Sequence, residues 1–381
     1  MKKKFICTVL SALITSAMPG LNSHAITENA DMPKGWLLWH SYTSYSEKDS
    51  HLFLQNPNGN ISEISGDFIH AMNGNFGNSP DKIVFMAIDE KADEWDIFLY
   101  DNEEITNLTQ NSGYRNEDPK WSPDGTSIVF KRGYWNSDIS DFTYNLALLD
   151  MNSMEVTMLT NDLYEEAMPC FSVDGKHIYY IKYNEGYGSI VCMNTDNGEI
   201  KTIFQEENIN AYYPMINDKY LYFTKWHSSE NHHDEIMVYD GNTAESMIFN
   251  SEIYDCSDAC PVDENSMIYS STKNGNYSLY YFNGTESIEI PGINTDKNEL
   301  GADFYLFSEE TIKNNVSGDI NADGVFNLSD IVSMQRWLLD VPGAEPVALE
   351  TCDLTDDDLL NVFDLIAMKR KLIKSADSVF I

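Results

Sequence analysis

Two acidic loops near the C-terminus carry oxygen-bearing side chains at the spacing that binds calcium. They are GDINADGVFNLSD at Gly318–Asp330 and CDLTDDDLLNVFD at Cys352–Asp364. A twelve-residue loop wraps Ca²⁺ with ligands at positions one, three, five, seven, nine and twelve, position seven giving a backbone carbonyl. The predicted ligands of the first loop are Asp319, Asn321, Asp323, Val325, Asn327 and Asp330. Gly324 at position six allows the sharp turn.

The second loop matches the same pattern less closely. Its predicted ligands are Asp353, Thr355, Asp357, Leu359 (carbonyl), Asn361 and Asp364. Thr355 is a poorer third ligand than Asn or Asp, and Asp358 stands where the turn favours glycine. We therefore expect the second site to bind calcium more weakly. Each loop precedes a short segment with apolar residues at i, i+3 and i+7, which predicts an amphipathic helix after each loop.

Tandem EF-hand-like loops, each followed by one helix, resemble a type I dockerin domain, which would span residues 318–376. The resemblance implies a tail that binds the cohesin module of a scaffoldin when calcium is present, as in a cellulosome. It implies cohesin contacts at Leu328, Ser329, Arg336, Val362, Phe363, Lys369 and Arg370. The two copies differ at these paired positions, so one preferred binding face is expected. A single calcium loop or an acidic surface run is the alternative interpretation.

The N-terminus and the charge predict an exported protein. Lys2–Lys4 precede a mostly apolar stretch, and Ser23-His24-Ala25 ends in a small-x-small pattern, which predicts a signal peptide over 1–25. The net charge of −37 disfavours nucleic acid and anionic membranes as partners.

Five cysteines follow the predicted cleavage site, an odd number that does not indicate a disulfide framework. Cys256 and Cys260 could pair with each other or stay free.

A repeat of forty-odd residues occupies residues 35–308. Segments such as DPKWSPDGTSIVF (Asp118–Phe130) and MPCFSVDGKHIYY (Met168–Tyr180) recur with spacings of 43, 50, 45 and 47. An apolar strand, a tight turn and further alternating strands predict four-stranded propeller blades. The first repeat begins at a second strand and the last segment matches an innermost strand, so the C-terminal strand should complete the N-terminal blade. We expect a mainly β, six-bladed propeller, then a linker at 309–317 and the small helical tail. The SPDG turns resemble those of TolB-like propellers.

This arrangement places a candidate site on one face of the propeller. We define the mouth face by the loops that enter each inner strand and the loops that join second and third strands, because both sets lie around the channel mouth. The predicted catalytic residues are Glu117, Asp118, Glu166, Asp258, Asp303 and His70. The predicted substrate-binding residues are Asn73, Arg115, Tyr212, Tyr213, Trp135 and Trp226.

Several carboxylates on a concave face suit glycoside cleavage, with an acid and a base of separated pKa values. Alternatively, such acids cap backbone amides of the neighbouring blade. One further cluster could either bind a metal or form a polar hairpin tip. It contains His227, His232, His233 and Asp234. The first hypothesis is therefore a secreted polysaccharide-active enzyme, a glycoside hydrolase or polysaccharide lyase. The second is a non-catalytic propeller that binds carbohydrate, and the third is one that binds protein.

Overall fold

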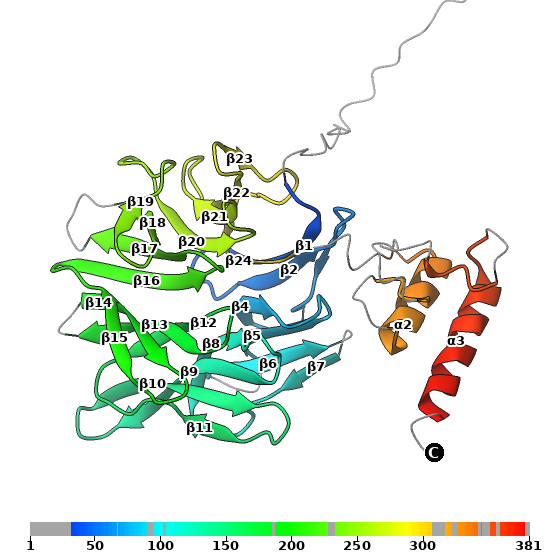
Figure 1. The fold of residues 1–381 in the computed structure, drawn as a ribbon, viewed down its shortest axis with the longest axis horizontal. Helices are drawn as coiled ribbons and strands as arrows, with labels where there is room; N and C mark the ends of the chain where they lie inside the picture. The colour runs from blue at the N-terminus through cyan, green and yellow to red at the C-terminus, as the bar shows by residue number, and fades with distance from the viewer. Residues whose placement is uncertain are drawn as a thin grey trace, which may run out of the picture.

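The computed structural model contains a ring of six four-stranded sheets and a separate pair of helices (Figure 1). It describes residues 32–66, 68–89, 94–101, 104–184, 187–227, 233–306, 317–321, 326–341, 344, 351–355 and 359–377. The predicted signal peptide, most of the predicted linker, Asp323, Val325, Asp357 and His232 lie outside these residues.

The six sheets are antiparallel blades, each with its strands ordered from the inner strand outward. Blade 1 contains β24 (Asn298–Leu306), β1 (Gly35–Tyr42), β2 (His51–Gln55) and β3 (Ile61–Glu63). Blade 2 contains β4 (His70–Phe76), β5 (Lys82–Ile88), β6 (Asp96–Asp101) and β7 (Glu104–Asn107). Blade 3 contains β8 (Arg115–Trp121), β9 (Ser127–Asn136), β10 (Asp141–Asp150) and β11 (Val156–Met158).

The other three blades follow the same order. Blade 4 contains β12 (Glu166–Phe171), β13 (His177–Asn184), β14 (Tyr187–Asn194) and β15 (Ile200–Phe204). Blade 5 contains β16 (Ile209–Ile216), β17 (Leu221–His227), β18 (Glu235–Tyr239) and β19 (Ala244–Ser246). Blade 6 contains β20 (Cys256–Pro261), β21 (Met267–Ser271), β22 (Ser278–Phe282) and β23 (Ser287–Glu289).

The ring is closed by the last strand of the propeller. β24 pairs antiparallel with β1, from Gly35 opposite Leu306 to Tyr42 opposite Asn298. This confirms the prediction that the C-terminal strand completes the blade begun at the N-terminus. Closure leaves no inner strand unpaired, which removes sheet edges that would otherwise invite association.

The cores lie between neighbouring blades. The middle strands carry buried apolar residues, either at alternate positions or in consecutive runs. Phe85, Phe130 and Phe223 are fully buried examples. These side chains pack against the adjacent blade, as Phe130 does in a cluster with Val84 and Met86 of blade 2. All five cysteines of the described chain are buried free thiols, which decides the alternative for Cys256 and Cys260.

The C-terminal helices are α2 (Leu328–Leu338) and α3 (Val362–Asp377). They pack on each other through a core of their own made by Ile320, Ile331, Met334, Cys352, Leu365 and Met368. The Asn327 side chain caps α2, and the Asp330 carboxylate accepts a hydrogen bond from the Asn327 backbone N–H, which together form a capping box. Among the described residues no helix is long and apolar enough to cross a bilayer.

Candidate functional site

One residue near the middle of each inner strand has a left-handed backbone conformation. These six residues have φ between 49° and 59° and are Asn73, Asp118, Met168, Tyr213, Asp258 and Gly301. In every blade the pairing register between the inner strand and its neighbour shifts there, which marks a β-bulge. A bulge redirects the side chain that it contains. The same device in all six blades therefore gives one matching set of residues around the propeller axis.

The left-handed backbone conformation costs free energy at two of these positions and requires glycine at a third. Met168 and Tyr213 are bulky residues for which positive φ is a genuine outlier, at a cost of about 1–3 kcal/mol each. At Gly301 an added Cβ would lie 2.5 Å from Cε1 of His40. The repeated conformation is thus imposed by the packing of the blades and not by residue preference alone.

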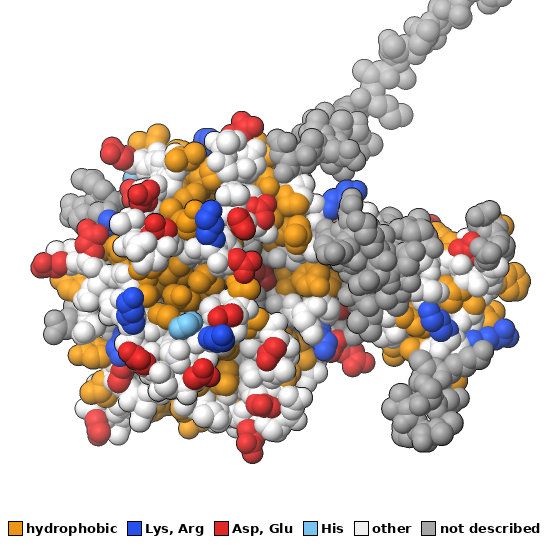
Figure 2. Space-filling model, viewed as in Figure 1, with side chains coloured by type: hydrophobic (Ala, Val, Ile, Leu, Met, Phe, Trp, Pro, Cys, Tyr) orange, Lys and Arg blue, Asp and Glu red, His pale blue; other side chains and the backbone are white. Residues whose placement is uncertain are grey.

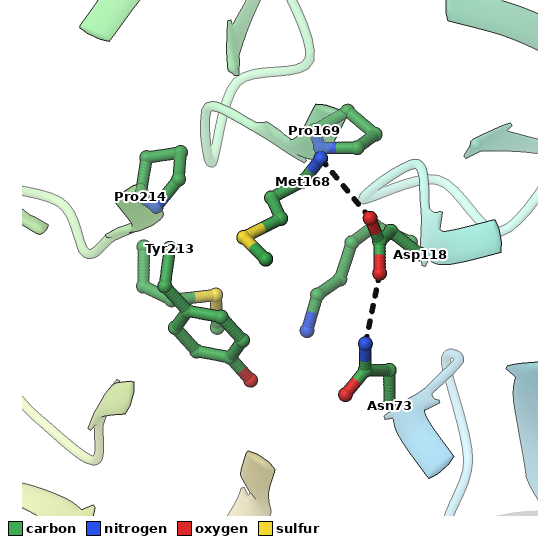
Figure 3. Close-up of a pocket in the computed structure, with 8 residues that line it drawn as sticks. Asn73, Asp118, Met168, Pro169, Tyr213 and Pro214 are labelled. Carbon is green, nitrogen blue, oxygen red and sulfur yellow. Dashed lines mark hydrogen bonds between the residues drawn. The ribbon is translucent and has the colours of Figure 1, made fainter. Parts of the chain in front are cut away.

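Four of the six residues line a small cavity near the axis. Asn73, Asp118, Met168 and Tyr213 enclose it together with Lys120, Pro169, Pro214 and Met215 (Figure 3). Its volume of about 10 Å³ accommodates roughly one water molecule. Ligand sites for small molecules usually exceed about 300 Å³. A sugar ring therefore cannot occupy this cavity, and a glycan would have to bind further out, on the mouth face.

Three predicted catalytic acids cap backbone amides of the next blade. Asp303 accepts a hydrogen bond from the Phe76 N–H at 2.7 Å. Asp118 accepts one from the Met168 N–H at 3.4 Å, and Asp258 accepts one from the Gly301 N–H at 3.3 Å. All three carboxylates are nearly buried, and burial raises the pKa of each. This geometry favours the alternative in which these acids connect blades.

The other two predicted catalytic acids form ion pairs with lysines directly opposite them in the sheet. Glu117 pairs with Lys131 at 3.0 Å and also with Arg115. Glu166 is fully buried and pairs with Lys182 at 3.4 Å, while its Oε2 has no hydrogen-bond partner. Burial raises the pKa of Glu166. Figure 2 shows both acidic and basic side chains on the face that it draws.

The remaining predicted residues lie at different depths. His70 is buried with its ring 4.7 Å from that of Trp95, and burial lowers its pKa. Asn73 donates a hydrogen bond to Asp118 at 2.8 Å. Trp135 is 59% exposed on the mouth face, whereas Trp226 is partly buried. The structure therefore brings Asn73, Asp118 and Tyr213 together and leaves His70 packed within the blades.

A cluster of acids and phenols on the mouth face was not predicted from the sequence. The Tyr212 hydroxyl donates to Asp234 at 2.6 Å, and the Tyr277 hydroxyl lies 3.4 Å from both Asp234 and Asp255. His233 Nδ1 lies 3.2 Å from Asp255. Tyr212 lies on β16, the inner strand of blade 5, and the other four residues come from loops of blades 5 and 6 that are distant in sequence. Of the predicted metal cluster, His233 and Asp234 therefore belong to a hydrogen-bonded network, and within the described residues no three His, Cys, Asp or Glu side chains are placed to hold a metal.

The two C-terminal loops share one pattern of hydrogen bonds. In the first, the Asp330 carboxylate accepts from the N–H of Ile320 at 3.0 Å and of Asn327 at 2.8 Å. In the second, Asp364 accepts from the N–H of Leu354 and of Asn361, both at 3.0 Å. Both carboxylates are fully buried. The described parts of the two loops thus surround the twelfth residue in the same way.

The predicted cohesin-binding residues differ in exposure between the two repeats. Val362, Phe363, Lys369 and Arg370 of the second repeat are exposed. In the first repeat Leu328 is exposed, Arg336 is partly buried and Ser329 is buried. Figure 2 shows apolar and basic side chains lying together on the helical part.

Comparison with solved structures finds the propeller architecture in other proteins. TolB from Acinetobacter baumannii is 16% identical with a TM-score of 0.58, over 71% of this chain and 66% of that chain. Hydrazine synthase from Kuenenia stuttgartiensis is 13% identical with a TM-score of 0.62, over 72% of this chain and 47% of that one. A chain of a nidogen/laminin complex is 9% identical with a TM-score of 0.53, over 71% and 99%.

These similarities cover the propeller part of the chain and, at such low identities, show the fold alone. The chain spans just under two thirds of the TolB chain and under half of the hydrazine synthase chain. It matches no protein-family model and no curated protein. The chain is therefore a six-bladed β-propeller with TolB-like neighbours, followed by two short helices.

Proposed function

We propose that this protein is an exported, calcium-dependent docking component whose tail binds a cohesin module of a scaffoldin and whose propeller binds plant polysaccharide. The observation that carries the first part is the repeated loop geometry. Asp330 and Asp364 accept hydrogen bonds from the backbone N–H groups of equivalent residues in the two loops. The dockerin-like sequence pattern and the exposed apolar residues on α3 support it.

The residues of the loops suit a calcium ion. Ca²⁺ prefers six to eight oxygen ligands, and a bound ion would link the loop to the first turn of its helix. Asp319, Asn321, Asn327 and Asp330 would hold it in the first loop together with Asp323 and the Val325 carbonyl. Asp319 and Asp330 are almost completely buried, and a divalent cation offsets the free energy that burial of two carboxylates costs.

Surface plasmon resonance against immobilised type I cohesin modules tests the docking role. We expect binding with Ca²⁺ and none after chelation. Phe363→Asp should weaken binding at least about 100-fold, because it puts a charge into a desolvated apolar contact. Ile253→Asp is the matched control, since Ile253 is an exposed apolar residue of the propeller. Calcium-independent binding, or equal binding by both variants, would contradict the proposal.

The aromatic residues of the propeller support a carbohydrate ligand. Within the described residues, four aromatic side chains of the propeller are exposed, namely Tyr45, Tyr114, Trp135 and Tyr164. Tyr45, Tyr114 and Tyr164 belong to loops of the mouth face, and Trp135 lies at the mouth-face end of β9. Two of them pack beside cations, Tyr114 next to Arg132 at 4.7 Å and Tyr164 next to Lys182 at 5.7 Å. Flat aromatic surfaces with polar neighbours suit sugar rings.

Binding is better supported than catalysis, because the candidate acids cap backbone amides or pair with lysines. A panel of plant glycans distinguishes the two. We expect Trp135→Ala to weaken binding about tenfold, a loss of about 1.4 kcal/mol that is typical of one exposed stacking contact. Glu117→Gln and Glu166→Gln should keep the affinity.

Products released by the wild type but not by Glu117→Gln, Asp118→Asn or Glu166→Gln would instead support the hydrolase or lyase hypothesis. Neither binding nor products would favour a protein-interaction propeller.

A further inference from the structure

The two helices of the tail are related by sequence but lie in different surroundings. Residues 34 positions apart are equivalent, so Ser329 corresponds to Phe363 and Val332 to Ile366. Ser329 is 8% exposed, whereas Phe363 is 63% exposed. Val332 and Arg336 are partly buried, whereas Ile366 and Arg370 are exposed. One face of the pair is therefore more covered than the other.

The first repeat contacts the propeller through Asp81. This residue lies in the turn between β4 and β5, on the face opposite the channel mouth. Its Oδ2 accepts hydrogen bonds from Asn321 Nδ2 at 2.6 Å and from Ser329 Oγ at 3.4 Å. Burial, reinforced by Asp81 and opposed by Arg336, raises the pKa of Tyr100 in β6 to about 12. Arg336 of α2 is therefore close enough to the outer part of blade 2 to act on Tyr100.

A large groove separates the rest of α2 from the propeller. Its volume is about 960 Å³, and Leu328, Val332 and Arg336 of α2 line it opposite Trp36, Tyr100 and Ile105 of blades 1 and 2. Figure 1 shows the helices beside these two blades. A groove of this volume means that the two parts do not form a packed core there. A few polar contacts at Asp81 therefore hold α2 towards the propeller.

The α3 face has no such cover in the described part of the chain. Val362, Phe363, Ile366 and Ile373 are all exposed and recur at helical spacing along one side of α3. Lys369 and Arg370 are exposed beside them. This surface suits a partner with an apolar patch bordered by acidic residues.

We propose that the propeller covers the α2 face through Asp81, so that the α3 face alone docks the partner. The inference rests on the proposed docking function, which it deepens by assigning one of two sequence-related faces. The contact at Asp81 thus favours one docking face for a structural reason, in addition to the sequence differences between the two repeats. Because the contact involves the turn face, docking leaves the channel mouth open to its ligand.

Cysteine labelling tests the covering of α2 without any partner. The five native thiols of the described chain are buried, so a mature chain carrying Val332→Cys or Ile366→Cys offers one reactive site. With a maleimide on a polyethylene glycol of several kilodaltons and Ca²⁺ present, we expect Val332→Cys to react at least about tenfold more slowly than Ile366→Cys. Adding Asp81→Arg should speed the first reaction and leave the second unchanged. Equal rates for the two variants in the chain that retains Asp81 would overturn the inference.

Cohesin binding provides the second arm. We expect Val332→Asp to leave the affinity of the full chain unchanged and Phe363→Asp to abolish binding, with partial recovery when Asp81→Arg frees the α2 face. Equal losses from Val332→Asp and Phe363→Asp would overturn the inference. If no cohesin module binds the wild type, the proposed function fails, while the labelling rates still decide whether α2 is covered. Unchanged melting of the propeller in each variant shows that the chain is folded.

Discussion

Removing Ca²⁺ with a chelator is expected to unfold the two C-terminal helices and leave the propeller folded. The tail depends on a small core of six buried residues and on two loops, each with a buried carboxylate at its twelfth position. A ligand present at a thousand times its dissociation constant stabilises the folded state by about 4 kcal/mol. A core of this size supplies no more than about 3–5 kcal/mol, so the tail should depend on the ion. The propeller has separate cores between its blades and a closed ring.

Differential scanning calorimetry with and without chelator measures this separation. We expect two transitions in Ca²⁺, of which only the smaller moves to lower temperature after chelation. Mg²⁺ at the same ionic strength is the control, because it needs a more rigid octahedral site. A propeller transition that shifts together with the smaller one would contradict two independently folded parts.

Asp258→Asn is expected to stabilise the propeller at neutral and alkaline pH. Burial, opposed by the Gly301 hydrogen bond and reinforced by Asp234, raises the pKa of Asp258 to about 7. The unfolded chain releases the proton near pH 4, so the folded state holds an extra proton between about pH 4 and 7. The free energy of unfolding therefore falls as the pH rises through this window. About three pKa units correspond to a loss of up to about 4 kcal/mol.

Asparagine keeps the shape of protonated aspartate and also tolerates the φ of 54° at this position. Urea unfolding at pH 4, 6 and 8 should show a gain for Asp258→Asn that grows with pH, towards the upper figure. Asp240→Asn is the control, because turn hydrogen bonds to exposed Asp240 lower its pKa. A gain independent of pH would mean that the Asp258 carboxylate is not destabilised by burial.

The blades were predictable because each depends on local patterns, and their closure followed from how the repeats begin and end. Alternating strands, SPDG turns and a regular spacing define a blade, and the incomplete first and last repeats could complete only each other. The amphipathic helices after the two acidic loops were predictable for the same reason. Each blade and each loop with its helix is encoded within some fifty neighbouring residues, whereas the closure pairs β1 with β24 from the two ends of the propeller.

The chemistry of the channel was less predictable because it depends on contacts between blades. Aspartate, asparagine and glycine tolerate positive φ, but Met168 and Tyr213 take the same conformation against their preference. The Tyr212–Asp234–Tyr277 cluster joins strand β16 to two loops, and no local pattern links them. By contrast, the pairing of Glu117 with Lys131 and of Glu166 with Lys182 could have been predicted from the sequence, because these residues face each other across predicted hairpins.

Calorimetric titration of Ca²⁺ into the metal-free mature chain tests the central claim most directly. We predict saturable binding of two ions per chain, the first loop binding more tightly, with Asp330→Ala and Asp364→Ala each removing one ion. Titration without saturable heat, or stoichiometry unchanged in both variants, would contradict the calcium-dependent tail on which the docking role depends.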